Sequence, residues 1–155
     1  EAIKADLSNT ISVFKESNVN PVLIGQIPEV GWDPLWILTK LHLFSDQEFD
    51  SPKFLSTSYK VFEQRNRKAK SILNAISDEK EIPIFFPETL FCNIGVSVGR
   101  CITQIAGDPL YYDDDHVSIR GANMIAEGLL SNYYDKCDAT EKESPLNFDD
   151  KLLNN

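Results

Sequence analysis

Two short apolar runs decide the fold class of this sequence: Val22–Ile27 (Val-Leu-Ile-Gly-Gln-Ile) and Ile82–Phe86 (Ile-Pro-Ile-Phe-Phe). Each run is nearly continuous in apolar character and ends at a proline, Pro28 or Pro87. This pattern is typical of a strand that is buried on both faces of a parallel sheet. Pro83 is compatible with it, because proline is tolerated among the first residues of a strand. We therefore predict two parallel β-strands.

Helical patterns precede, separate and follow the two runs. We expect an amphipathic helix over residues 2–17, a short apolar helix after Pro34, a longer helix over residues 56–76, and a final helix capped by Ser118. Apolar residues recur on the expected inner faces: Ile3, Leu7, Ile11, Phe14; Leu35, Trp36, Leu38, Leu41; Tyr59, Phe62, Ala69, Ile72, Leu73, Ile76; Ile119, Ala122, Ile125, Ala126, Leu129, Leu130, Tyr133. The order of helices and strands predicts an α/β domain with a parallel sheet.

Part of this domain is expected to be missing on its N-terminal side. Two strands make a poor sheet, and a doubly wound domain normally opens with a strand, whereas this chain opens with a helical pattern. The chain starts at Glu1 without a charged and then apolar leader, so we expect a cut end and no signal peptide. Residues 135–155 are acidic and weakly patterned, which indicates an extension that follows a domain of residues 1–134.

The composition argues against two classes of partner. The 155 residues include 24 acidic and 15 basic side chains, which gives a formal net charge of -9. Nucleic acids and anionic lipid surfaces both need a basic footprint, so we expect neither as a partner. The basic run over residues 65–70 is interpreted as the solvated face of a helix. No stretch approaches the ~20 apolar residues that cross a bilayer.

The three cysteines leave several interpretations open. Cys92 and Cys101 enclose a short loop with two glycines, and a disulfide across it would stabilise the fold by roughly 2–3 kcal/mol in an oxidising compartment. Two reduced thiols, or half of a metal site, are the alternatives. The spacing is not Cys-x-x-Cys, and His42 and His116 are the only histidines. Cys137 is left over and is expected to be free or paired outside this chain.

The segment Pro109–Ala122 (Pro-Leu-Tyr-Tyr-Asp-Asp-Asp-His-Val-Ser-Ile-Arg-Gly-Ala) carries the candidate chemistry. Asp113 and His116 are separated by two residues, so a turn can bring the carboxylate against one ring nitrogen and leave the other free. We expect this other nitrogen to face a cleft. This is the orienting half of a nucleophilic triad, in which the carboxylate fixes the tautomer and the imidazole takes a proton from a nucleophile. The following helix N-terminus would lower the histidine pKa and the carboxylates would raise it.

Two simpler interpretations compete with catalysis. The acidic turn can serve only to cap the helix, with His116 incidental to it. Alternatively, Asp113, Asp114 and Asp115 can bind a hard cation. A calcium loop needs oxygen ligands at alternating positions and a distal bidentate Glu, and this stretch supplies neither.

A family resemblance favours catalysis. The pattern Asp-x-x-His-x-Ser-x-x-Gly-Ala, formed by Asp113, His116, Ser118, Gly121 and Ala122, resembles the last conserved block of the SGNH (GDSL-like) hydrolase superfamily. One branch is more similar still: the SGNH domains fused C-terminally to membrane acyltransferases that O-acylate bacterial surface polysaccharides. The residues that carry this closer similarity are Tyr111–His116, the pair Cys92 and Cys101, and the segment Gln26–Pro34. The similarity is collinear from about Ala2 to Leu130.

The resemblance implies a fold, an activity and a location. It implies a flavodoxin-like, three-layer parallel-sheet fold in which His116 is the general base and Asp113 is its orienting acid, with no metal or organic cofactor. It implies that Cys92 and Cys101 form a disulfide outside the cytoplasm. The partners would be an acyl donor, with acetyl the expected group, and a glycan acceptor. A membrane acyltransferase domain of the parent protein would tether the domain to the inner membrane on its periplasmic or extracytoplasmic side.

The sequence departs from the family at the nucleophile. The superfamily carries its serine in a Gly-Asp-Ser block after the first strand, and here Gly107 and Asp108 are followed by Pro109. A Gly-x-Asn-Asp block and a Gly-x-Ser-x-Gly elbow are absent as well. We therefore expect this chain to be the C-terminal part of an SGNH O-acyltransferase domain that is inactive by itself and needs an N-terminal segment with the serine. The alternatives are a free-standing secreted SGNH carbohydrate esterase and a non-catalytic binding module that lost the serine.

Trp32 and Asp33 are candidate substrate-binding residues. They follow the carboxyl end of the first predicted strand, where α/β folds place their ligands. A sugar-stacking role for Trp32 competes with that of a buried structural tryptophan.

Overall fold

The computed structural model describes residues 2–44 and 55–133. The predicted extension over residues 135–155, with Cys137 in it, lies outside the described residues. Along the chain the elements are α1 (Ala2–Glu16), β1 (Leu23–Ile24), α2 (Pro34–Phe44), β2 (Thr57–Ser58), α3 (Tyr59–Lys80), β3 (Ile84–Phe85), α4 (Glu88–Phe91), β4 (Arg100–Cys101), β5 (Gln104–Ile105), β6 (Asp108–Pro109) and α5 (Ile119–Tyr133).

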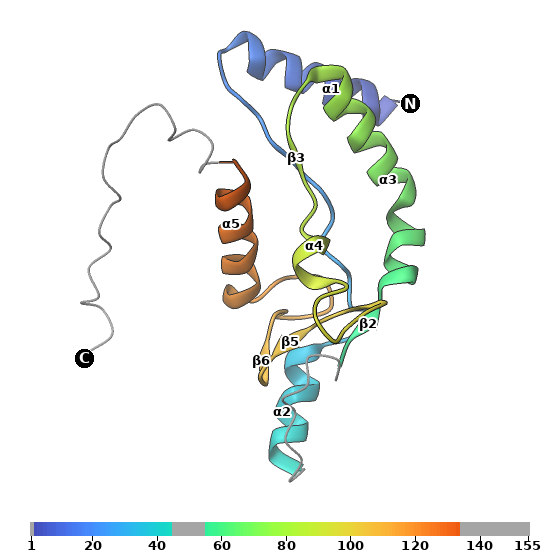
Figure 1. The fold of residues 1–155 in the computed structure, drawn as a ribbon, viewed down its shortest axis with the longest axis vertical. Helices are drawn as coiled ribbons and strands as arrows, with labels where there is room; N and C mark the ends of the chain where they lie inside the picture. The colour runs from blue at the N-terminus through green and yellow to red at the C-terminus, as the bar shows by residue number, and fades with distance from the viewer. Residues whose placement is uncertain (1, 45–54, 134–155) are drawn as a thin grey trace, which may run out of the picture.

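The two predicted strands form a parallel pair at the centre of the fold. Leu23 is in register with Ile84 and Ile24 with Phe85, through backbone hydrogen bonds that include Gly25 N–H to the Phe85 carbonyl at 2.8 Å. The pair lies between helices α1 and α3 on one side and α5 on the other (Figure 1). The α/β class predicted from the sequence is confirmed.

The strands differ from the prediction in length and in burial. Each pairs over only two residues, and the side chain of Ile24 is 51% exposed, so β1 is not buried on both faces as expected. Successive side chains of a strand point to opposite faces, so Leu23 and Ile84 face α1 and α3 while Ile24 and Phe85 face the α5 side. Helix α5 covers Phe85, which contacts Tyr133 with ring centroids 6.4 Å apart, and Ile24 is left half open.

Helix α3 begins and ends at identifiable signals. The Ser58 hydroxyl accepts a hydrogen bond from the Val61 N–H at 3.4 Å, which caps the first turn. At the other end Glu81 adopts the left-handed conformation (φ 50°), and its N–H donates to the Ser77 carbonyl, which ends the helix. The helix therefore ends at Lys80, four residues after the predicted end at residue 76.

Helices α1 and α3 pack against each other over the face of the strand pair that carries Leu23 and Ile84. Buried Ile11, Leu23, Ile76 and Ile82 form this cluster, with Leu7, Ile72, Leu73 and Ile84 packed around it. Polar contacts flank it: the Ser8 hydroxyl donates to Glu79 at 3.0 Å and Lys4 pairs with Glu79 at 3.2 Å. These contacts explain why α1 and α3 lie side by side.

The predicted inner faces of the helices are correct only in part. Ile11, Leu38, Phe62 and Ile76 are buried as expected, and the exposed members are Ile3 and Phe14 of α1, Leu35 and Trp36 of α2, Ala69 of α3, and Ile119, Ala122, Ala126 and Leu130 of α5. Helix α5 turns only part of its predicted face inward: Ile125 packs against the core and Tyr133 contacts Phe85, while Gly121 and Met124, which were not predicted, are also turned inward. The apolar face of α5 is wider than the surface that packs against it. One apolar stripe of this helix is therefore left exposed in the described residues.

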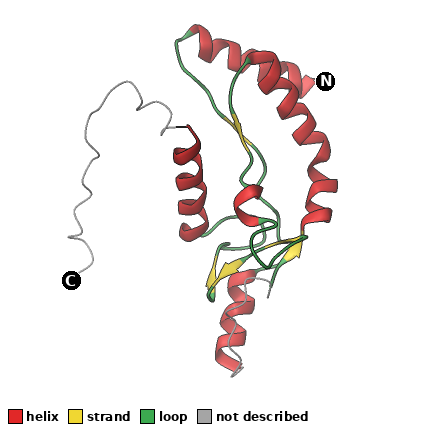
Figure 2. Cartoon of the chain, in the orientation of Figure 1, coloured by secondary structure: helices red, strands yellow, loops and turns green. Residues whose placement is uncertain are grey.

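Five small elements were not predicted. Strands β2 and β4 pair antiparallel, β5 and β6 form a hairpin, and α4 is a single turn after β3 (Figure 2). Two residues per strand are too few to show an alternating pattern, which is why the sequence did not indicate them. Within the described residues, every helix is too short or too polar to cross a membrane.

Candidate active site

The acidic segment after β6 forms a closed turn. The Tyr112 N–H donates to the His116 carbonyl at 2.7 Å, and Tyr111 pairs with Val117 in an isolated bridge. The chain therefore leaves the core at Tyr111 and returns to it at Val117. We call the turn over residues 112–116 the acid–base loop. Residues 113–115 form its outer part.

The loop brings Asp113 and His116 together, as the sequence predicts. His116 Nδ1 lies 3.0 Å from Asp113 Oδ1 and 2.9 Å from Oδ2. Asp113 Oδ1 also accepts the backbone N–H groups of His116 at 2.7 Å and of Asp115 at 3.1 Å. The two backbone donors, His116 first, and then the imidazole hold the pKa of Asp113 at about 2, so the carboxylate is ionised at neutral pH.

A second carboxylate reaches the same ring nitrogen. Asp115 Oδ1 lies 2.9 Å from His116 Nδ1. The hydrogen bond that His116 donates to Asp113, and then the charges of Asp113, Asp115 and Asp114, raise the pKa of His116 above its usual 6.5. The sequence left the direction of this shift open, and the pKa is raised, which is the direction that the carboxylates favour. Asp115 was not predicted as a partner of His116, although the two residues are neighbours.

His116 stands at an open surface. Its side chain is 74% exposed, and with Nδ1 occupied by carboxylates the outward nitrogen is Nε2. We expected this nitrogen to face a cleft. The cavity next to the loop, of about 260 Å³, lies between residues 29–31 and the start of α3, and His116 does not line it.

The Gln26–Pro34 segment lies directly against the acid–base loop. The Tyr111 hydroxyl donates to the Pro28 carbonyl at 2.8 Å, and the Val30 N–H donates to the Asp114 carbonyl at 2.9 Å. Tyr111 and Val30 also share one core cluster. Two motifs that are some 80 residues apart in the sequence are thus joined by hydrogen bonds. The sequence contained no signal of these contacts.

Trp32 and Asp33 lie in that segment and have structural contacts. Trp32 is half buried and packs against the core cluster of Tyr111 and Val30. Asp33 Oδ1 accepts the Trp36 N–H at 2.8 Å and so caps the start of α2. The positions of Trp32 and Asp33 are therefore explained by these structural contacts. Their roles in binding a substrate stay predictions.

The start of α5 fits tightly under the acid–base loop. The Ser118 hydroxyl accepts the Gly121 N–H at 3.2 Å, which is the predicted cap, and donates to the Pro109 carbonyl at 2.7 Å. A Cβ at Gly121 would lie 2.3 Å from the Leu110 carbonyl oxygen. Ser118 and Gly121 of the motif therefore have a structural explanation: they let α5 abut the chain that leads into the loop.

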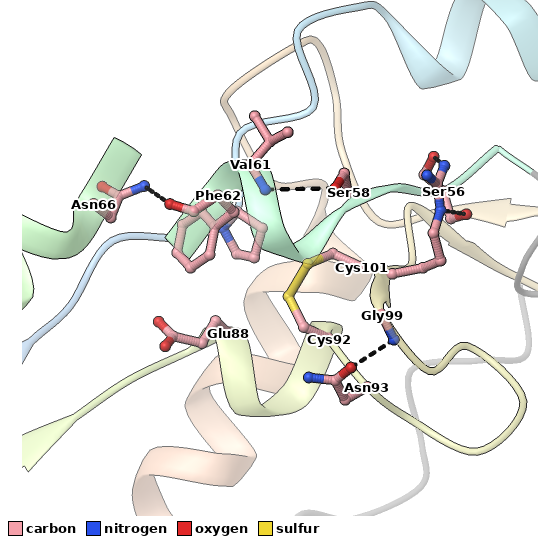
Figure 3. The surroundings of a disulfide bond; sticks show 12 residues. Ser56, Ser58, Val61, Phe62, Asn66, Glu88, Cys92, Asn93, Gly99 and Cys101 are labelled. Carbon is pink, nitrogen blue, oxygen red and sulfur yellow. Dashed lines mark hydrogen bonds between the residues drawn. A yellow bond between two sulfur atoms is a disulfide. The ribbon is translucent and has the colours of Figure 1, made fainter. Parts of the chain in front are cut away.

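The predicted disulfide is present. The sulfurs of Cys92 and Cys101 are bonded at 2.04 Å, and the bond links the end of α4 to β4, beside the first turn of α3 (Figure 3). Asn93 accepts the Gly99 N–H at 2.7 Å and closes the loop between them. Phe91, Cys92 and Cys101 are buried with Tyr111 in one cluster, so the disulfide braces the core beneath the acid–base loop.

Among the described residues, the acid–base loop holds one group of side chains that could hold a metal ion. Atoms of Asp113, Asp115 and His116 lie within 4.8 Å of one another. Exposed carboxylates gather without a metal, and the His116 nitrogen in contact with them already has hydrogen-bond partners. The donor set is therefore explained as a carboxylate–imidazole pair and indicates no metal site by itself.

Comparison with known families adds one match. A family model described as SGNH domain (fused to AT3 domains) matches residues 1–131. Searches among curated proteins and among solved structures gave no match. The family match covers both motifs joined by the hydrogen bonds above, and both cysteines of the disulfide.

Proposed function

The chain belongs to the family of SGNH domains fused to AT3 domains, and from this premise we propose that it is the acid–base part of an O-acyltransferase domain. In this proposal His116 is the general base and Asp113 is the acid that orients it. The observation that carries the proposal is the contact of His116 Nδ1 with the Asp113 carboxylate at 2.9 Å. That contact fixes the proton on Nδ1 and leaves Nε2 as the acceptor.

The reaction follows from this tautomer. A serine hydroxyl gives its proton to Nε2 of His116 while its oxygen attacks the acyl carbonyl of a donor. The tetrahedral intermediate collapses, the leaving group takes the proton from His116, and an acyl-serine remains. A glycan hydroxyl then loses its proton to Nε2 and attacks the acyl-serine, and the serine recovers the proton as the acylated glycan leaves. Asp113 stabilises the imidazolium in both halves of the reaction.

The nucleophile is proposed to come from another segment of the parent protein. The sequence holds no Gly-Asp-Ser block, and Ser118, the serine nearest to His116 in the sequence, is engaged as the cap of α5. Ser118 also donates its hydroxyl proton to the Pro109 carbonyl, so it does not present that proton to His116. A separate N-terminal segment with the serine therefore suits the chemistry better than Ser118 does.

Two open surfaces support the docking of such a segment. In β1 the N–H groups of Leu23 and Gly25 bond toward β3, so the N–H and C=O of Ile24 point to the opposite edge, where a further strand can pair. Ile24 and the open α5 stripe (Ile119, Ala122, Ala126, Leu130) are apolar. A strand on that edge, followed by a helix beside α5, would cover both surfaces and complete the sheet.

The proposal also covers the compartment in which the domain acts and the substrate that it acylates. The family's fusion to AT3 domains supports a membrane acyltransferase parent for this domain. We propose that the domain acts on the periplasmic or extracytoplasmic side, where the Cys92–Cys101 disulfide is stable, and transfers acetyl to cell-surface glycans. The net charge of -9 suits a neutral glycan better than a polyanionic acceptor.

The experiment combines the chain with the missing part. The purified chain is assayed on a small acetyl ester, alone and with the N-terminal segment of its parent protein added. We expect no turnover by the chain alone, turnover with the segment, and loss of that turnover in His116→Ala, because triad members act as a unit. His42→Ala, which changes the other histidine on α2, is the matched control. Turnover by the chain alone that depends on His116 would show that this chain supplies its own nucleophile.

One second candidate rests on a specific observation. The absence of a Gly-Asp-Ser block also suits a non-catalytic binding module with an SGNH fold. Such a module would bind a glycan with and without Asp113 and His116, and adding the N-terminal segment would produce no turnover. A parent gene in which Gly-Asp-Ser precedes these residues would rule this candidate out, and one with no membrane domain would indicate a free-standing esterase.

A further inference from the structure

We propose that Tyr111 is a positioning residue for the acid–base pair: its hydroxyl, through the Pro28 carbonyl, holds the acid–base loop where His116 meets Asp113. The proposal deepens the proposed function and rests on it for any catalytic consequence. The structural part stands on contacts of the described residues.

Tyr111 sits at the base of the loop and is almost completely buried. Its side chain is 1% exposed, and its ring packs on Phe91 with centroids 5.7 Å apart. Its hydroxyl donates to the Pro28 carbonyl at 2.8 Å. Burial raises the pKa of this phenol, so the hydroxyl keeps its proton and remains a donor. A buried carbonyl that loses such a donor is left unsatisfied, so the contact resists opening.

The outer part of the loop is attached to the same segment. The Asp114 carbonyl accepts the Val30 N–H at 2.9 Å and the Gly31 N–H at 3.4 Å. Gly31 has φ +78°, a conformation that other residues adopt only at a cost. Base and tip of the loop are therefore both tied to residues 28–31, the base through Tyr111 and the tip through Asp114.

This double attachment bears on His116 through the backbone. Asp113 Oδ1 accepts the backbone N–H groups of Asp115 and His116, and these donors converge only while the turn keeps its shape. The same carboxylate then meets His116 Nδ1. If residues 28–31 move, the Asp114 carbonyl and the turn move with them, and the imidazole spends less time against Asp113. The raised pKa of His116 reports this contact.

A pair of adjacent tyrosines supplies a matched test. Tyr111→Phe removes only the buried hydroxyl, whereas Tyr112→Phe removes a hydroxyl from a ring that is 67% exposed. The titration of each variant is followed by the imidazole C–H signals in NMR, with His42 as the internal reference signal. We expect Tyr111→Phe to lower the His116 midpoint toward 6.5 while the far-UV circular dichroism stays unchanged, and Tyr112→Phe to leave the midpoint where it is.

Gly31→Ala provides a second variant, which loosens the tip of the acid–base loop without removing the Tyr111 hydroxyl. It should lower the His116 midpoint in the same direction, and it decides the question if Tyr111→Phe does not fold. A folded Tyr111→Phe with a lower melting temperature and an unchanged His116 midpoint would overturn the proposal, because Tyr111 would then act on stability alone. A wild-type midpoint that is not raised would contradict the Asp113–His116 pair itself, and with it the proposed function. In the reconstituted enzyme Tyr111→Phe should lower kcat with little change in KM.

Discussion

Gly121 lies so close to Leu110 that a Cβ on the glycine would sit 2.3 Å from the leucine carbonyl oxygen. The contact sets α5 directly against the chain that leads into the acid–base loop, and it explains the glycine of the motif by close approach.

Gly121→Ala should therefore destabilise the domain. The new methyl meets backbone that cannot give way, so overpacking of about 1–3 kcal/mol should exceed the roughly 0.5–1 kcal/mol that alanine gains in a helix. Gly128→Ala in the same helix is the control, because its nearest neighbour is the end of the Leu90 side chain, which can move. Urea unfolding of both variants measures the difference, and an equal or smaller loss in Gly121→Ala would contradict the close approach.

Asp113→Asn should lower the pKa of His116. The hydrogen bond that His116 donates to the Asp113 carboxylate is the largest cause that raises this pKa, followed by the charges of Asp113 and Asp115. The amide keeps the shape but removes the charge, so the His116 titration should move toward 6.5. Asp78→Asn, on α3, makes the same change in net charge away from the loop. NMR titration measures the shift, and equal midpoints in the two variants would count against the pair.

The stability of the domain should depend on pH through the same two groups, with opposite signs. The folded pKa of Asp113 is lowered from 3.8 to about 2, so its contribution is present above pH 3.8 and is lost as the pH falls toward 2. The folded pKa of His116 is raised, so its contribution is present below pH 6.5 and is lost as the pH rises through the folded value. The free energy of unfolding is measured for wild type and Asp113→Asn over a range of pH. The difference between the two should shrink as the pH falls toward 2 and as it rises through the folded pKa of His116. A difference that is constant across this range would contradict the assignment.

Removing the disulfide should lower the free energy of unfolding by roughly 2–3 kcal/mol, as the chain-entropy model gives for so short a loop. The double variant Cys92→Ser, Cys101→Ser measures it by denaturant unfolding, with Cys137→Ser as the control. A thiol titration of the denatured, unreduced chain should detect one free thiol, that of Cys137, and three after reduction. Three free thiols before reduction would contradict the bond.

Leu130→Ser should weaken the docking of the N-terminal segment while leaving the chain itself nearly as stable. Leu130 is 50% exposed on the open stripe of α5, and such surface changes usually stay within about 0.5 kcal/mol. Ile125→Ser on the packed face of the same helix should instead lower the melting temperature. Calorimetric titration with the segment measures docking. Unweakened binding to Leu130→Ser would place the segment elsewhere.

The sequence alone determined the features that depend on neighbours in the chain. The positions of α1, α3 and α5 followed from apolar residues at helical spacing, and the cap of α5 followed from Ser118. The contact of Asp113 with His116 followed from a spacing that one turn can close. Local hydrogen bonds and helical periodicity arise within a few residues, so a short stretch of sequence is enough to specify them.

Only the tertiary structure decided which surfaces meet. It showed that β1 buries Leu23 and leaves Ile24 half open, and that α5 turns Gly121 inward and Ile119, a residue of the predicted inner face, outward. It also joined Tyr111 to Pro28, residues some 80 positions apart. An apolar pattern shows that a face can be buried, but the neighbour that buries it is placed by the packing of the whole chain. Where the described residues place no such neighbour, as at Ile24 and Leu130, the apolar surface stays exposed.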